Sequence, residues 1–103
     1  MASYTVYKCK GCDRGFIATE RTVDYYDYVS VEVYGCKWCG YSDSLQGETV
    51  ASGEGSIPKK FTDKMYFAGV AAAYGPYGGA CDTDMFGRTV GNIQREPPKP
   101  NNR

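Results

Sequence analysis

Four of the five cysteines stand in two close pairs that suit metal binding. Cys9 and Cys12 form one Cys-x-x-Cys motif, Cys36 and Cys39 form a second, and 23 residues separate the pairs. Two intervening residues let the backbone curl so that both sulfurs of a pair point at one ion. Peptide N–H groups in such turns hydrogen-bond the sulfurs and spread the thiolate charge. We therefore expect Cys9, Cys12, Cys36 and Cys39 to bind one Zn²⁺ ion through four thiolates.

The residues that follow each pair fit the turns that such a site requires. Gly40 follows the second pair, and glycine adopts positive φ without a Cβ clash. Asp13 takes the same place after the first pair, and Asp tolerates this backbone region better than most residues. Both positions therefore favour tight turns around the sulfurs.

Residues 4–45 resemble a zinc ribbon. The resemblance rests on Cys9-x-x-Cys12 and on Cys36-x-x-Cys39 followed by Gly40 and Tyr41. It implies a small β-rich zinc-ribbon domain, which we place at residues 1–47, with Zn²⁺ as its cofactor. Zinc ribbons occur in transcription factors, ribosomal proteins, enzymes and viral proteins, so the resemblance carries no function by itself.

Other uses of the paired cysteines stay open at this point. Disulfides suit small secreted domains, but the polar start of the chain does not read as a secretory signal. A thioredoxin-like redox pair normally lies within a βαβ pattern, and neither motif is surrounded by one. A rubredoxin-like site would hold iron with the same four sulfurs. Among these hypotheses we favour a zinc site.

Short strands are expected to carry the two cysteine pairs. Residues 4–8 lead into the first pair, and residues 16–23 mix apolar and polar side chains as a second strand would. Val29, Val31 and Val33 alternate with polar or aromatic residues, a β-branched pattern that predicts a strand over residues 28–34. That strand runs directly into Cys36.

The second half of the chain has a different texture. Residues 48–103 are expected to form an irregular extension rich in Gly, Ala and Pro. Within it we predict a short strand at 48–51, one helix at about 62–74, a Gly-rich loop at 75–79, a strand at 85–93 and an extended Pro-rich tail at 95–103.

Composition limits the classes of function. The formal net charge is zero, with 12 basic and 12 acidic residues, which weighs against a non-specific nucleic-acid binder. No apolar run approaches the ~18 residues of a membrane span. The fifth cysteine, Cys81, would be awkward in a secreted protein. We expect a reducing intracellular location, or a place within a virus particle, with no signal peptide.

Catalysis is not expected. The chain has no histidine, so the commonest general base is missing. A zinc ion held by four cysteines offers no open position to a substrate or water. We expect instead a structural or accessory subunit of a larger protein assembly, such as a virion or tail component. Its ten tyrosines suit interfaces with protein neighbours.

The alternative is a protein that binds nucleic acid or a transcription complex through the cysteine turns. Lys10, Arg14 and Lys37 lie in or next to these turns. Trp38 and Tyr41 could stack on bases there. These five side chains are the predicted partner or nucleic-acid contacts.

Overall fold

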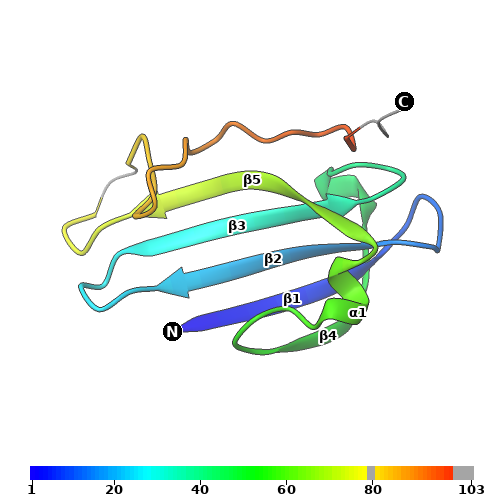
Figure 1. The fold of residues 1–103 in the computed structure, drawn as a ribbon, viewed down its shortest axis with the longest axis horizontal. Coiled ribbons are helices and arrows are strands. Elements are labelled where there is room, and N and C mark those ends of the chain that lie inside the picture. Colours follow the sequence, from blue (N-terminus) through cyan, green and yellow to red (C-terminus); the bar gives the residue numbers. More distant parts are fainter. Residues whose placement is uncertain (79–80, 99–103) are drawn as a thin grey trace.

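The computed structural model describes residues 1–78 and 81–98. Its framework is one five-stranded antiparallel sheet with the strand order β4-β1-β2-β3-β5 (Figure 1). No helix in this part of the chain is long and apolar enough to cross a membrane. The elements are β1 Ala2–Cys9, β2 Phe16–Val23, β3 Val29–Cys36, the 3-10 turn η1 Asp43–Leu45, β4 Gln46–Glu54, the helix α1 Lys59–Thr62 and β5 Met65–Tyr74.

The three central strands form where the sequence predicts them. β2 has the predicted bounds, and β1 and β3 extend the predicted strands as far as Cys9 and Cys36. Because β1 and β3 both pair antiparallel with β2, their last residues lie at the same end of the sheet. We call this end the cysteine end.

The helix predicted at about 62–74 is wrong. Residues 65–74 form the edge strand β5, and the short helix α1 precedes them. Gly69 has a φ of +143°, which no helix interior contains, and a Cβ at this position would approach the carbonyl of Asn92 to 2.8 Å. The helix preference of the alanines gives way to pairing with β3, a contact that local sequence does not encode.

The second half of the chain is less irregular than predicted, because it supplies both edge strands. β4 includes the predicted strand at 48–51 and pairs with β1, while β5 pairs with β3. The boundary proposed at residue 47 therefore falls within β4 and within a single sheet. Residues 48–103, which the sequence predicts to be an extension, therefore complete the sheet that carries the cysteine pairs.

Residues 81–98 loop near the end of β5 and then run back beside this strand (Figure 1). The strand predicted at 85–93 is absent, since Thr89 and Val90 make only isolated bridges. The N–H of Gly91 donates to the Val70 carbonyl at 2.6 Å, and the N–H of Gln94 donates to the Ala68 carbonyl at 2.7 Å. Of the Pro-rich tail predicted at 95–103, residues 99–103 lie outside the described part.

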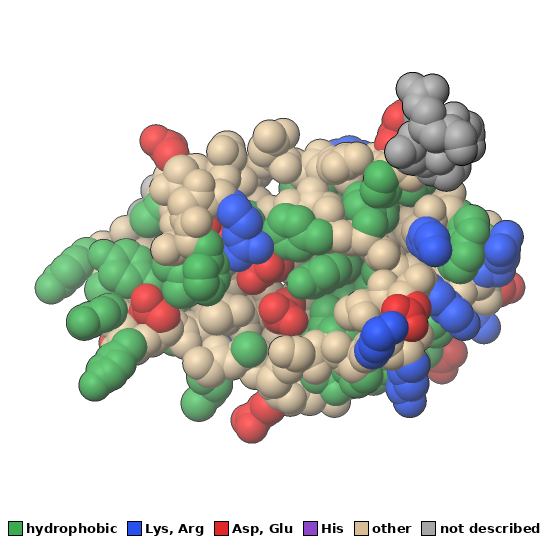
Figure 2. Space-filling view, in the orientation of Figure 1, with side chains coloured by type: hydrophobic (Ala, Val, Ile, Leu, Met, Phe, Trp, Pro, Cys, Tyr) green, Lys and Arg blue, Asp and Glu red, His purple; other side chains and the backbone are tan. Residues whose placement is uncertain are grey.

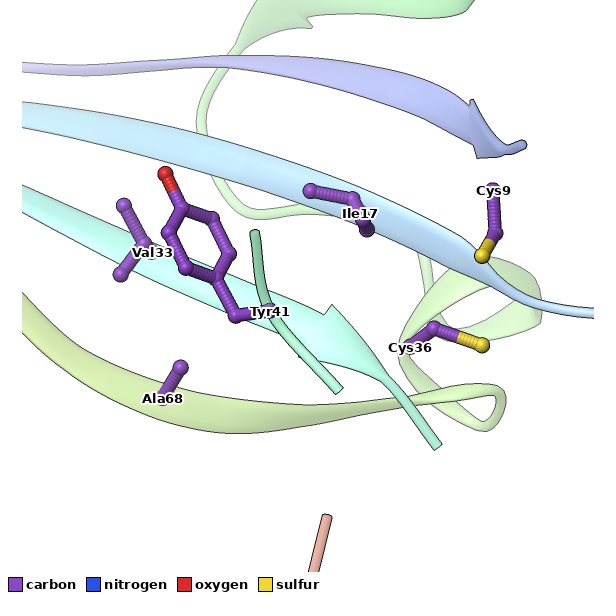
Figure 3. Packing of buried hydrophobic residues seen from close by; sticks show 6 residues of the cluster. All are labelled: Cys9, Ile17, Val33, Cys36, Tyr41 and Ala68. Atoms are coloured by element: carbon purple, nitrogen blue, oxygen red, sulfur yellow. The ribbon is translucent and has the colours of Figure 1, made fainter. Parts of the chain in front are cut away.

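Two apolar clusters lie on opposite faces of the sheet, because neighbouring strand residues such as Ile17 and Ala18 point to opposite sides. One cluster extends from the cysteine end, and Figure 3 shows the Tyr41 ring lying over β3 beside Val33. Its buried members are Cys9, Ile17, Val33, Cys36, Tyr41 and Ala68. The other contains Val6, Ala18, Ile57 and Met65, with Phe61 of α1 packed against it.

Candidate metal centre

The sheet brings the two cysteine pairs together at one end. Cys9 is the last residue of β1 and Cys36 is the last residue of β3, so the start of β2 lies between them. Gly15 stands at this point, and a Cβ there would overlap the Cys36 sulfur. Only glycine leaves room for the sulfurs to meet above the start of β2.

The four sulfurs form one compact cluster. The sulfurs of Cys9, Cys12, Cys36 and Cys39 all lie within 4.8 Å of one another, and those of Cys12 and Cys36 are 3.6 Å apart. Ligand distances of ~2.3 Å in a tetrahedral zinc site place sulfurs ~3.8 Å apart. All four cysteines are free thiols here. The cluster could therefore hold a metal ion.

Backbone groups support the sulfurs as the sequence predicts. The N–H of Gly11 donates to the Cys9 sulfur and the N–H of Trp38 donates to the Cys36 sulfur, each at 3.4 Å. Asp13 and Gly40 follow the two pairs with φ values of 58° and 91°. These bonds and turns fix the direction of the sulfurs and disperse their charge.

The two partly exposed thiols differ in acidity. Burial acts to raise the pKa of Cys12, but hydrogen bonds from the backbone of Arg14 and Gly15 and from neighbouring thiols lower it to about 7. Burial and the neighbouring thiols raise the pKa of Cys39 to about 12. Four thiols this close resist joint ionisation, and a bound cation removes this conflict by replacing their protons.

The structure places four of the five predicted contact residues at the surface of the cysteine end. The Arg14 guanidinium lies 4.2 Å from the centroid of the Trp38 ring, and the Lys37 ammonium lies 6.0 Å from it. Trp38 is 39% exposed, and Lys10 is exposed. Tyr41 is elsewhere: its ring is buried in the core, and its hydroxyl donates to Asp43 at 3.0 Å.

Comparison with protein-family models, with curated proteins and with solved structures gives no match. The interpretation of the site therefore depends on its geometry and on the chemistry of its donor set.

Cations gather around the cysteine end, as Figure 2 shows beside α1. Two of them pair with carboxylates: Lys8 with Asp13 at 3.7 Å and Lys59 with Asp63 at 2.9 Å. The formal net charge is zero, but the basic side chains are distributed unevenly along the molecule. Seven of the 12 lysines and arginines lie in or next to the cysteine turns, in α1 or just before β5: Lys8, Lys10, Arg14, Lys37, Lys59, Lys60 and Lys64.

A second charged cluster was missed by sequence reasoning. Glu32 and Asp84 are buried, and Arg88 contacts them at 2.8 and 2.7 Å. Ser30 is also buried and donates to Asp84 at 3.5 Å. Ser30 and Glu32 belong to the residues that alternate with the valines of β3, and contacts with Asp84 and Arg88 cover them. The only sequence signal for this cluster is weak: Asp82 and Asp84 lie close to Arg88 in the chain.

Proposed function

We propose that the protein is a non-catalytic structural or accessory subunit of a protein assembly, built around a zinc ion held by Cys9, Cys12, Cys36 and Cys39. The observation that carries the zinc assignment is the cluster of four sulfurs within 4.8 Å, supplied by two Cys-x-x-Cys turns. Borderline-soft Zn²⁺ matches this donor set and its tetrahedral spacing. A site with four protein ligands has no free position for a substrate, so its role is structural.

The position of the sulfurs supports a role in stability. The pairs join the ends of β1 and β3, the two neighbours of the central strand β2. Structural zinc supplies roughly 10–16 kcal/mol in small peptides, which is as large as the whole stability of a typical domain, about 5–15 kcal/mol. We therefore expect metal removal to unfold the entire sheet.

The end of the molecule opposite the cysteines supports an interaction with protein neighbours. Apolar side chains project there from the β2–β3 hairpin and the turn after β5 (Figure 2). Tyr25, Tyr26 and Tyr77 are 87%, 72% and 100% exposed. Tyrosine rings gathered in water at one place are typical of protein interfaces. We call the loops 24–28 and 75–78 the aromatic end.

A second candidate function, nucleic-acid binding, is favoured by one observation at the cysteine end. Arg14 stacks over the exposed Trp38 beside Lys37, and the N–H of Lys37 donates to the backbone of Lys64 at 3.1 Å. A basic surface with an aromatic ring suits single-stranded nucleic acid. We rank it second because the aromatic end exposes more apolar surface than this single ring.

A photo-crosslinking residue placed at two positions separates the two functions. At Tyr77 it should cross-link to protein in the cells that express the chain, and at Trp38 it should give few products. Val50 on β4 is 43% exposed and serves as a matched control position. Cross-links to nucleic acid from Trp38, with none from Tyr77, would replace the first function by the second.

A salt titration provides an independent test of the second candidate. Arg14→Glu/Lys37→Glu should abolish any salt-dependent binding of single-stranded DNA or RNA. Arg21→Glu, at an exposed position of β2 away from the cysteine turns, also reverses a charge, with half the total change, and should leave that binding intact.

A further inference from the structure

The aromatic end contains an open groove of about 560 Å³. Its lining comes from two loops that lie far apart in the sequence: Tyr26, Asp27 and Tyr28 from the β2–β3 hairpin, and Pro76 and Tyr77 from the turn after β5. Three tyrosines, one proline and one carboxylate thus form a surface with apolar walls and one negative charge.

The groove walls are held by specific contacts. The Asp24 carboxylate accepts the N–H groups of Tyr26 and Tyr28 at 2.8 and 3.0 Å, which fixes the hairpin. The Tyr28 ring lies against Gly75, where a Cβ would come within 2.8 Å of the ring. The N–H of Gly78 closes the second loop on the Gly75 carbonyl at 3.1 Å. These contacts hold the backbone of both loops and the Tyr28 ring in place.

Grooves lined by tyrosines bind extended proline-rich segments. A polyproline helix has no internal hydrogen bonds and is already ordered, so its proline rings pack on aromatic faces at little entropic cost. A carboxylate at the edge of such a groove selects a basic residue in the ligand. Asp27 supplies this charge, and Asp24 lies three residues before it.

The chain itself contains a segment with these properties. Residues 97–100 read Pro-Pro-Lys-Pro, a Pro-x-x-Pro motif, and Arg95 and Arg103 flank it. Its basic residues complement the acidic hairpin.

The described residues that lead into this segment lie far from the groove of their own molecule. The Arg95 carbonyl accepts the N–H of Tyr41 at 2.9 Å, and Pro97 packs beside Gly40, which bridges to Cys36 at the end of β3. Tyr28 lies just before the start of β3, and an eight-residue strand spans ~24 Å. Arg95 and Pro97 therefore lie at the cysteine end, about one strand length from the groove of the same molecule, and we take a second copy as the partner of the segment.

We propose that the groove of one copy binds residues 97–100 of a second copy, so that copies join head to tail. This contact deepens the proposed function, on which it rests, by naming one partner within the assembly. It is heterologous, because two different surfaces meet, and repetition generates a ring or an open filament. Tyr26, Tyr28 and Tyr77 would pack on the prolines, and Asp27 would face Lys99.

Mixing two variants of the full chain tests this contact. The zinc-loaded protein should self-associate with rising concentration in sedimentation velocity. Tyr77→Ala removes the groove and Lys99→Glu/Pro100→Ala removes the ligand, and each should weaken self-association at least tenfold. Mixed together, they should form a one-to-one complex, because one intact groove and one intact segment remain. Val50→Ala and Asn101→Ala are the matched controls and should associate like the unmodified chain.

Three results would overturn the contact. The first is an unmodified chain that stays monomeric at about 1 mM. The second is loss of association in Tyr77→Ala while Lys99→Glu/Pro100→Ala associates like the unmodified chain, which would mean that two aromatic ends meet symmetrically. The third is failure of the mixed variants to form a complex. If Tyr77 still cross-links to a different protein in cells, the assembly function survives while the head-to-tail contact fails.

Discussion

The buried charge cluster beneath residues 81–90 gives the most quantitative prediction. Arg88 donates to Glu32 at 2.8 Å and to Asp84 at 2.9 Å, and the side chains of these acids are only 8% and 0% exposed. The backbone N–H groups of Phe86 and Arg88 also donate to Asp84, at 2.9 and 2.8 Å. Glu32 depends on Arg88 alone among the contacts of the described residues.

We predict that Arg88→Met destabilises the protein by about 3 kcal/mol. Removing one partner of a buried ion pair costs roughly 3–5 kcal/mol, because an uncompensated charge is left in a poor solvent. The Arg88 side chain is 35% exposed, so the lower end of this range applies. For a domain of about 100 residues, such a loss lowers the Tm by roughly 12–24 °C.

Urea unfolding followed by circular dichroism, with zinc fixed and in excess, measures this loss as a shift in the midpoint. Lys59→Met is the matched control: it breaks the Lys59–Asp63 pair, also 2.9 Å long, but these side chains are 85% and 59% exposed. This change should cost less than about 1 kcal/mol. Glu32→Gln/Arg88→Met should recover part of the loss. Equal losses of stability in Arg88→Met and Lys59→Met would show that burial adds nothing to the cost of breaking the Arg88 pairs.

Two further predictions concern the Glu20 carboxylate and the turn at Gly40. Burial, followed by the charge of Glu32, raises the pKa of Glu20 above its ordinary value. Its ionised form therefore destabilises the fold, so Glu20→Gln should increase stability at pH 7, and this gain should fade as the pH falls through the raised pKa towards about 4. Unfolding curves at several pH values measure the gain, and one that is unchanged down to pH 3.5 would contradict the sign. Gly40 and Gly55 have φ values of 91° and 90°, but a Cβ on Gly40 would overlap the Arg95 carbonyl, whereas Gly55 has open space around it. Gly55→Ala should lower the free energy of unfolding by roughly 1–3 kcal/mol through backbone strain, and Gly40→Ala should lower it by more. Gly40→Ala should also weaken zinc binding, measured in competition with a coloured chelator. Equal losses of stability in the two variants would show that the overlap at Gly40 is relieved.

The local features of the site could be predicted from the sequence. Spacing alone identified the four cysteines, because Cys-x-x-Cys turns have few uses. The N–H bonds to sulfur and the positive φ at Asp13 and Gly40 followed from the same turns. Valine alternation identified β3, since a β-branched period of two has one structural meaning.

What could not be predicted depends on contacts between distant residues. The alanines of 65–74 favour a helix locally, and only pairing with β3 and the approach of residue 92 to Gly69 make them a strand. The burial of Glu32 depends on Arg88, 56 residues further along the chain, and nothing in the sequence of β3 indicates this contact. Gly15 gave no signal either, because the sulfur that needs its space lies 21 residues further along the chain.

The most direct test of the zinc site combines metal analysis with X-ray absorption on the full-length protein. We predict one zinc per chain with four sulfur neighbours at about 2.3 Å, and no change in Cys81→Ser. Cys36→Ser should lose the tightly bound metal. Disulfides among Cys9, Cys12, Cys36 and Cys39 in the freshly isolated protein, or zinc with fewer than four sulfur neighbours, would contradict the account.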